Sequence, residues 1–191
     1  MAFVSFLRAG HGLGGLFTRE PDRYRHCMDL GKTLMTGPGE LKRRERELLA
    51  AYVSALNACS FCAGTHTGIA RAFGWDANVL EDLLEDPAAA AVPETLTPIL
   101  LFVRKLTLQP MRCTAADVEA ITKAGWTEQT VSDVVAIAAY YAMTNRLASG
   151  HGIEALSGEE NAAIGRHIAE QGYPDIESLA VPRSDEDGEI G

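Results

Sequence analysis

Long hydrophobic runs are missing from this sequence. No apolar stretch reaches the roughly 20 residues that a membrane-spanning helix needs. Residues 1–8 are apolar, but the stretch is too short for a secretory signal and has no basic start. We therefore expect a soluble, cytoplasmic protein with no membrane partner.

Basic side chains are also scarce. The chain has 17 Lys and Arg against 26 Asp and Glu, which gives a formal net charge of −9. Binding to nucleic acid needs an excess of Lys and Arg that displaces the counterions of the phosphates. Adhesion to an anionic membrane surface needs the same excess. Both classes of partner are therefore excluded.

Cysteine is sparse and unevenly placed. The four cysteines are Cys27, Cys59, Cys62 and Cys113, which are too few and too irregular for the disulfide scaffold of a secreted protein. In a reducing compartment a close pair of cysteines is more typical of catalysis or metal binding.

Alternation of period two is absent, so the sequence predicts no sheet and an all-α fold. We expect an irregular segment at 1–18, a helical domain at 19–172 and an acidic tail at 173–191, disordered from 184 onward. The apolar positions in the domain recur at helical spacing, and the run at 127–148 is apolar on more than one face, which favours a central helix. The expected helices are 21–35, 40–57, 59–73, 76–84, 94–108, 114–123, 127–148 and 158–171.

A weak internal repeat joins two places in this domain. Gly74-Trp75-Asp76 and Gly125-Trp126-Thr127 are each followed by apolar and acidic residues at the same offsets. Each Gly suits the residue after a helix end, and each Asp or Thr suits the cap of the next helix. The repeat indicates either two similar corners or two structurally related halves.

The segment from Cys59 to His66 carries the strongest chemical signal. On a helix, Cys59 and Cys62 are three residues apart and Cys62 and His66 are four apart, so all three share one face. A thiolate at a helix start is stabilised by free N–H groups, and His66 can hold or take a proton. A peroxide or disulfide substrate needs an attacking thiolate, a base and a resolving thiol.

Other interpretations compete for the same residues. A structural zinc site could use both cysteines and His66, but it normally needs a fourth ligand, and His11, His26 and His151 lack motif spacing. Two inert buried cysteines and a core histidine are the remaining alternative. We expect no metal and no cofactor.

The spacing of Glu47, Cys59, Cys62 and His66 resembles the AhpD-like (alkyl hydroperoxidase D-like) branch of the carboxymuconolactone decarboxylase superfamily. The core of this likeness covers about residues 40–75, and a weaker likeness extends to about residue 170. The segment 144–150 also looks like the subgroup of peroxidase-related enzymes. The resemblance implies an all-α AhpD-like domain with the CxxC pair at the N-terminal end of a helix.

The resemblance also implies roles. Cys62 would attack the peroxide and become a sulfenic acid, and Cys59 would condense with it to a disulfide that an external dithiol, on a protein or lipoyl group, reduces. His66 and Glu47 would form the proton relay. The best-known members carry a His immediately before the second cysteine; here Phe61 stands there and the implied relay is shorter. A homo-oligomer, dimer to hexamer, is implied as well.

Periodicity alone treats Glu47 differently. It lies off the apolar stripe of Leu48, Tyr52 and Leu56, so the helical wheel predicts a solvated charge, as it does for the charged run 42–46. The motif spacing is what places Glu47 in the site.

The sequence is therefore compatible with three functions. The favoured one is a thiol peroxidase or disulfide reductase acting on a small peroxide or disulfide. The second is a decarboxylase of the same superfamily without redox turnover, although that chemistry has no need of paired thiols. The third is a zinc-binding or interaction module without enzymatic activity.

Overall fold

The computed structural model describes residues 2–7 and 10–179, and the acidic segment 184–191 lies outside them. Over the described residues the chain is helical and contains no strand, which confirms the all-α prediction. Its α-helices are α1 (Gly12–Arg19), α2 (Pro21–Thr36), α3 (Arg43–Leu56), α4 (Ser60–Ala72), α5 (Val79–Glu85), α6 (Thr97–Leu108), α7 (Ala115–Lys123), α8 (Glu128–Gly150) and α9 (Gly158–Gln171), with short 3-10 helices η1 (Pro110–Arg112) and η2 (Ile176–Leu179). None of these helices is long and apolar enough to cross a bilayer.

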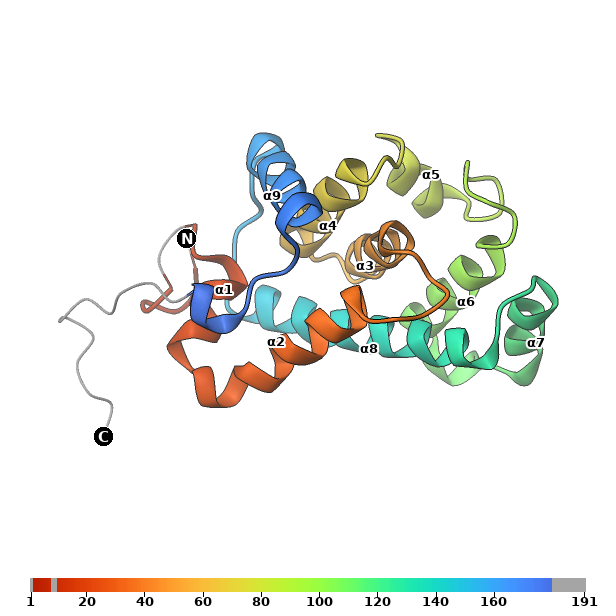
Figure 1. Cartoon of the computed structure of the whole chain (residues 1–191), viewed down its shortest axis with the longest axis horizontal. Helices are drawn as coiled ribbons and strands as arrows, with labels where there is room; N and C mark the ends of the chain where they lie inside the picture. Colours follow the sequence, from red (N-terminus) through yellow and green to blue (C-terminus); the bar gives the residue numbers. More distant parts are fainter. Residues whose placement is uncertain (1, 8–9, 180–191) are drawn as a thin grey trace.

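Helix α3 lies at the centre, with α4 and α5 on one side and the long helix α8 on the other (Figure 1). An unbroken run of its residues, from Arg46 to Ser54, is buried. The sequence favoured α8 as the central helix, but α8 keeps an exposed side that includes Val135 and Met143. The small side chains of α3 explain the difference, because they let neighbouring helices approach it from all sides.

The prediction of an irregular segment at 1–18 is wrong for its last part, because α1 begins at Gly12. Glycines lower its helix propensity, so packing rather than propensity stabilises it. Leu16 is fully buried and Phe17 nearly so, against Leu7, Tyr24 and Ile176. The apolar contacts of α1 therefore come from the chain on either side of it and from the distant segment around Ile176.

The prediction of an acidic tail from residue 173 is wrong for residues 173–179, because this segment packs against the helical domain. Ile176 is buried at the start of η2, and two exposed ion pairs join this segment to α2: Lys32 with Asp175 and Arg25 with Glu177. The charged run 42–46 also departs from a solvated face, because Arg46 is 4% exposed and donates to the backbone carbonyl oxygens of Leu34 and Leu41.

The two Gly-Trp corners are alike in detail. After α4, the N–H of Trp75 bonds the carbonyl of Ala70, and after α7, the N–H of Trp126 bonds that of Ile121. Each indole then donates to a carbonyl 31 residues earlier, Trp75 at 2.7 Å and Trp126 at 2.6 Å. The likeness therefore extends over two pairs of helices, α3 with α4 and α6 with α7. It favours two related halves over two chance corners.

Helix α9 contacts α4 along its length, and glycines make this contact close. A Cβ added to Gly165 would lie 2.3 Å from the carbonyl oxygen of Gly68. One added to Gly68 would lie 2.3 Å from the carbonyl oxygen of Asn161. The two backbones touch, so α9 is held directly over the helix that carries the cysteines.

Candidate functional site: a thiol pair beside a buried proton relay

A tight corner between α3 and α4 sets the position of the first cysteine. Ala58 has the left-handed φ of 56°, and the N–H of Cys59 bonds the carbonyl of Ser54 at 2.9 Å. With the bond from Ala58 to the carbonyl of Ala55, this is a Schellman ending, which usually places Gly where Ala58 stands. The chain therefore turns sharply into Cys59, the residue that caps α4.

The two thiols form one hydrogen-bonded pair. Cys59 is 2% exposed and Cys62, in the first turn of α4, is 3% exposed, and neither is in a disulfide. The hydrogen bond that the Cys62 thiol donates lowers the pKa of Cys59 to about 6, although burial opposes it. The N–H groups of Cys62 and Phe61 and the Ser149 side chain help. The same bond and burial raise the pKa of Cys62, so the first negative charge rests on Cys59.

Polar groups from α3 and α8 lie against the pair. Asn145 hydrogen-bonds Cys62, which counteracts part of the rise in its pKa. The Asn145 amide also donates to the Ser54 hydroxyl at 2.9 Å and accepts from the Asn57 amide at 3.0 Å. Because these bonds fix Asn145, the thiol pair has a rigid polar neighbour on its buried side.

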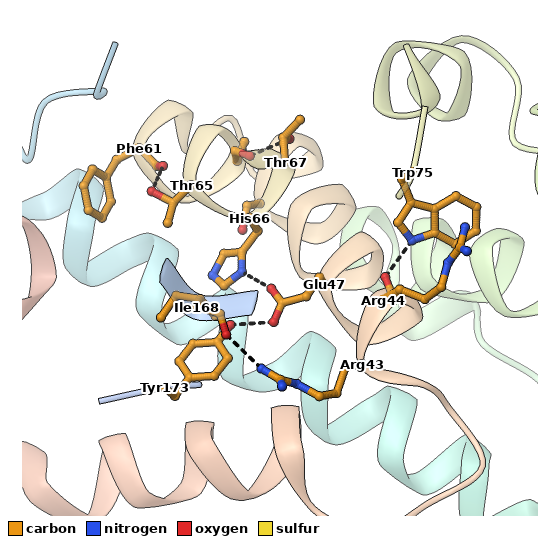
Figure 2. A network of polar contacts seen from close by, with 12 residues as sticks. Arg43, Arg44, Glu47, Phe61, Thr65, His66, Thr67, Trp75, Ile168 and Tyr173 are labelled. Atoms are coloured by element: carbon orange, nitrogen blue, oxygen red, sulfur yellow. Dashed lines mark hydrogen bonds and ion pairs between the residues drawn. The ribbon is translucent and has the colours of Figure 1, made fainter. Parts of the chain in front are cut away.

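A second polar group lies one turn further along α4. The Nδ1 of His66 and the Oε2 of Glu47 are 2.8 Å apart, and the hydroxyl of Tyr173 donates to Oε1 at 2.8 Å (Figure 2). Glu47 is fully buried, and His66 is 8% exposed. A carboxylate held by Tyr173 accepts from Nδ1–H, which leaves the other ring nitrogen, Nε2, to take or give a proton.

Two tyrosines complete this group. Tyr141 shares a hydrogen bond with Tyr173, and its ring meets the His66 ring edge-on, with centroids 4.5 Å apart. Burial raises the pKa of both tyrosines, and the nearby Glu47 raises them further. Both therefore stay protonated and act as donors.

A cavity of about 330 Å³ opens onto Cys62 and His66. Its wall is mainly apolar and is built by α1, α2, α4, α8, α9 and the chain at Tyr173, Pro174 and Leu179; it includes Leu13, Phe17, Met28, Ile69, Ile164 and Ile168. Such a lining favours an apolar molecule over a charged one. Cys62 and His66 face this molecule together.

The structure brings Glu47 and His66 together and places Cys59 beside Cys62. It does not pair Cys62 with His66 directly, since the Cys62 thiol donates to Cys59 instead. Tyr173 is the residue that the sequence analysis missed. It is distant in sequence from the motif, and no local pattern marks it.

The remaining donors lie apart. Cys27 is half-buried and hydrogen-bonded to Tyr140, and burial raises its pKa. Cys113 lies between η1 and α7. Within residues 2–7 and 10–179, no three His, Cys, Asp or Glu side chains gather in a way that could hold a metal ion.

The model of the carboxymuconolactone decarboxylase family matches residues 21–96. This range includes Glu47, both cysteines and His66. It ends before α6, so α8, α9 and Tyr173, which complete the cavity and the relay, lie outside it. Among proteins of curated function, none matches the chain.

Solved structures are similar over most of the chain. An AhpD-core, peroxidase-related protein from Ralstonia eutropha JMP134 is 27% identical, with a TM-score of 0.71 over 79% of this chain and 78% of that one. A peroxidase-related protein from Silicibacter sp. TM1040 is 23% identical, with a TM-score of 0.72 over 78% of each chain. A protein of unknown function from Agrobacterium tumefaciens, suggested to be the antioxidant defence protein AhpD, is 17% identical, with a TM-score of 0.61 over 74% of this chain and 96% of that one. At these identities, the last two structures show a likeness of fold and nothing further.

Proposed function

We propose that this chain, a member of the AhpD-like/carboxymuconolactone decarboxylase superfamily, is a thiol-dependent peroxidase or disulfide reductase. Its working residues are Cys59, Cys62, His66 and Glu47. The observation that carries the proposal is the hydrogen bond between the two thiols, one of which, Cys62, lines an apolar cavity. One acidic thiol beside a second thiol is what reversible disulfide chemistry needs.

The oxidation begins at Cys62, because Cys62 lines the cavity and Cys59 does not. As a peroxide reaches it, the Cys62 proton passes to Cys59 along their hydrogen bond. The Cys62 sulfur attacks the terminal peroxide oxygen and the O–O bond breaks. Cys62 becomes a sulfenic acid, and the departing alkoxide takes a proton to form an alcohol.

The relay supplies that proton. As an imidazolium held by the Glu47 carboxylate, His66 gives its Nε2 proton to the alkoxide and regains one from water. Tyr173 orients the Glu47 carboxylate through its 2.8 Å hydrogen bond. The relay thus acts on the oxygen that leaves, while Cys59 acts on the sulfur that attacks.

The disulfide then closes. The Cys59 thiol attacks the sulfenic sulfur of Cys62, an S–S bond forms, and the hydroxyl leaves as water. One peroxide and two thiols give one alcohol, one water and one disulfide. An external dithiol returns both electrons and both protons by exchange.

A decarboxylase needs no thiol pair, and a zinc module needs further ligands near the pair. The acidity of Cys59 has no use in a decarboxylase, and the described residues offer no group of three side chains that could hold zinc. Redox turnover therefore accounts for more of the site than the alternatives do.

The test is a titration of free thiols before and after one equivalent of cumene hydroperoxide. We expect the loss of the two thiols of the pair, and mass spectrometry should find them linked as Cys59–Cys62. A Cys27→Ser, Cys113→Ser variant is the control and should behave like the wild type. Unchanged thiols, or a link between Cys27 and Cys113, would sink the proposal.

A sulfenic-acid trap divides the roles. Cys59→Ser should accumulate trapped sulfenic acid on Cys62, whereas Cys62→Ser should react slowly. The charge on Cys59 argues for the opposite order. Trapping on Cys59 in the Cys62→Ser variant would therefore reverse the roles without removing the redox function.

A further inference from the structure

The two sulfurs lie on the walls of two different depressions. Cys62 lines the apolar cavity described above. Cys59 lines a second, more open hollow of about 420 Å³ on the other side of the helix start. Its wall comes from the α3–α4 corner and from the end of α8 and the chain after it: Ala58, Ser60, Ser149, Gly152, Glu154 and Ala155.

Phe61 stands between the two. Phe61 lines both the cavity and the hollow. The ring is held from the side of α1, since a Cβ added to Gly12 would lie 2.8 Å from its Cζ atom. Phe61, next to Cys62 in the sequence, therefore lies between the surroundings of the two sulfurs, and a third depression of about 190 Å³ borders it as well.

From this arrangement we propose that the two substrates reach the pair from opposite sides: an apolar oxidant enters the cavity and meets Cys62, and a dithiol reductant docks in the hollow and meets Cys59. The inference rests on the proposed function and extends it with a reductant site. The dithiol belongs in the hollow because Cys59 is the sulfur that this hollow reaches.

The chemistry agrees with this division. In the oxidised pair, a reductant thiolate in the hollow attacks the Cys59 sulfur, and the S–S bond breaks with Cys62 as the leaving thiolate. Asn145 stabilises that thiolate, and it takes up a proton to become the thiol. The second reductant thiol then attacks the mixed disulfide, which frees Cys59 and leaves the reductant as its own disulfide.

The test blocks each side separately in the full chain. Ala155→Trp fills the hollow from an exposed position, and Ile164→Trp fills the cavity from α9. Ala163→Trp, exposed on α9 and lining neither, is the matched control. Ser60→Trp and Met28→Trp are second variants for the hollow and the cavity, and a melting curve shows which proteins fold.

Iodoacetamide first measures access without any redox step. In a Cys62→Ser background, blocking the hollow should slow alkylation of Cys59 by about tenfold, and blocking the cavity should leave it unchanged. In a Cys59→Ser background the pattern for Cys62 should be the reverse. Residue-resolved mass spectrometry separates these sites from Cys27 and Cys113.

The half-reactions then follow with the intact pair. Ala155→Trp should slow reduction of the disulfide by dithiothreitol about tenfold and spare oxidation by cumene hydroperoxide, and Ile164→Trp should do the opposite. If either block slows alkylation of both cysteines, the two sides share one entrance and the inference is wrong. If the hollow block slows neither alkylation nor reduction, it is equally wrong. A wild type that peroxide does not oxidise would remove the proposed function alone, because the alkylation result stands without it.

Discussion

Helices α4 and α7 end in the same Gly-Trp corner, but their first turns differ. When the two corners are aligned, Cys113 falls at the position of Cys62 and Asp117 at that of His66. Pro110 falls at the position of Cys59, and a 3-10 turn replaces the start of the helix. The second half thus keeps one cysteine of the pair and has neither its partner thiol nor the histidine.

The environment of the two cysteines differs accordingly. Cys59 caps α4 and receives hydrogen bonds from Cys62 and from backbone N–H groups, and these lower its pKa to about 6. Burial and the charge of Asp117 raise the pKa of Cys113. The helix α7 begins after Cys113, so its free N–H groups point elsewhere. One helical corner can therefore carry a reactive thiol or an ordinary one, and the first turn decides which.

The largest effect should appear in alkylation at different pH values. Cys59 should react with iodoacetamide increasingly as pH rises through about 6. Cys113 should react only well above neutral pH, because its pKa is raised. At pH 7 the thiolate fractions should differ by about a hundredfold. Residue-resolved mass spectrometry of pulse-labelled protein measures both rates at once, and equal rates at pH 7 would erase the contrast between the halves.

The close contact between α9 and α4 should give the next largest effect. Gly165→Ala places a methyl group against the backbone of α4 and should lower the free energy of unfolding by about 2 kcal/mol. The corresponding face of α7 carries the exposed Glu119, so no helix covers it in the same way. Urea unfolding checks the loss. Gly158→Ala, which meets open space at the start of the same helix, is the control, and an equal loss there would contradict the close contact.

The relay gives a smaller effect on rate. Tyr173→Phe removes a hydrogen-bond donor from the buried Glu47, so the carboxyl group holds His66 less firmly. Oxidation by cumene hydroperoxide should slow about tenfold, whereas alkylation of Cys59 by iodoacetamide should keep its rate. The second half has Pro98 where Glu47 stands, so it has no such relay. Tyr24→Phe, buried outside the cavity lining, is the control; slower alkylation together with slower oxidation would make Tyr173 merely structural.

The smallest effect concerns the corner before the pair. Ala58→Gly removes the strain of a left-handed alanine and should raise the free energy of unfolding by about 0.5–1 kcal/mol. The corresponding residue of the second half, Gln109, has a φ of −147° and gains nothing from Gly. Thermal and urea unfolding measure the change. Ala55→Gly inside α3 should lose about 1 kcal/mol, and a loss at Ala58 as well would contradict the strain.

The helical class and most helix positions could be predicted from the sequence alone, because the spacing of apolar residues and the Gly and Pro residues at helix ends act locally. Helix α9, expected at 158–171, has those bounds in the structure. The closeness of Cys59 and Cys62 follows from the same local spacing, since residues three apart at a helix start lie near each other.

Tertiary structure decided the rest. The burial of Glu47 follows from small side chains that let α4 and α9 come close, which no single helical wheel reports. Tyr173 reaches Glu47 because the chain after α9 folds back, and the cavity exists because α1 and η2 close over it. The Cys62 proton goes to Cys59 rather than to His66 for the same reason. Burial and hydrogen-bond partners depend on contacts between segments far apart in the chain, and local spacing does not contain them.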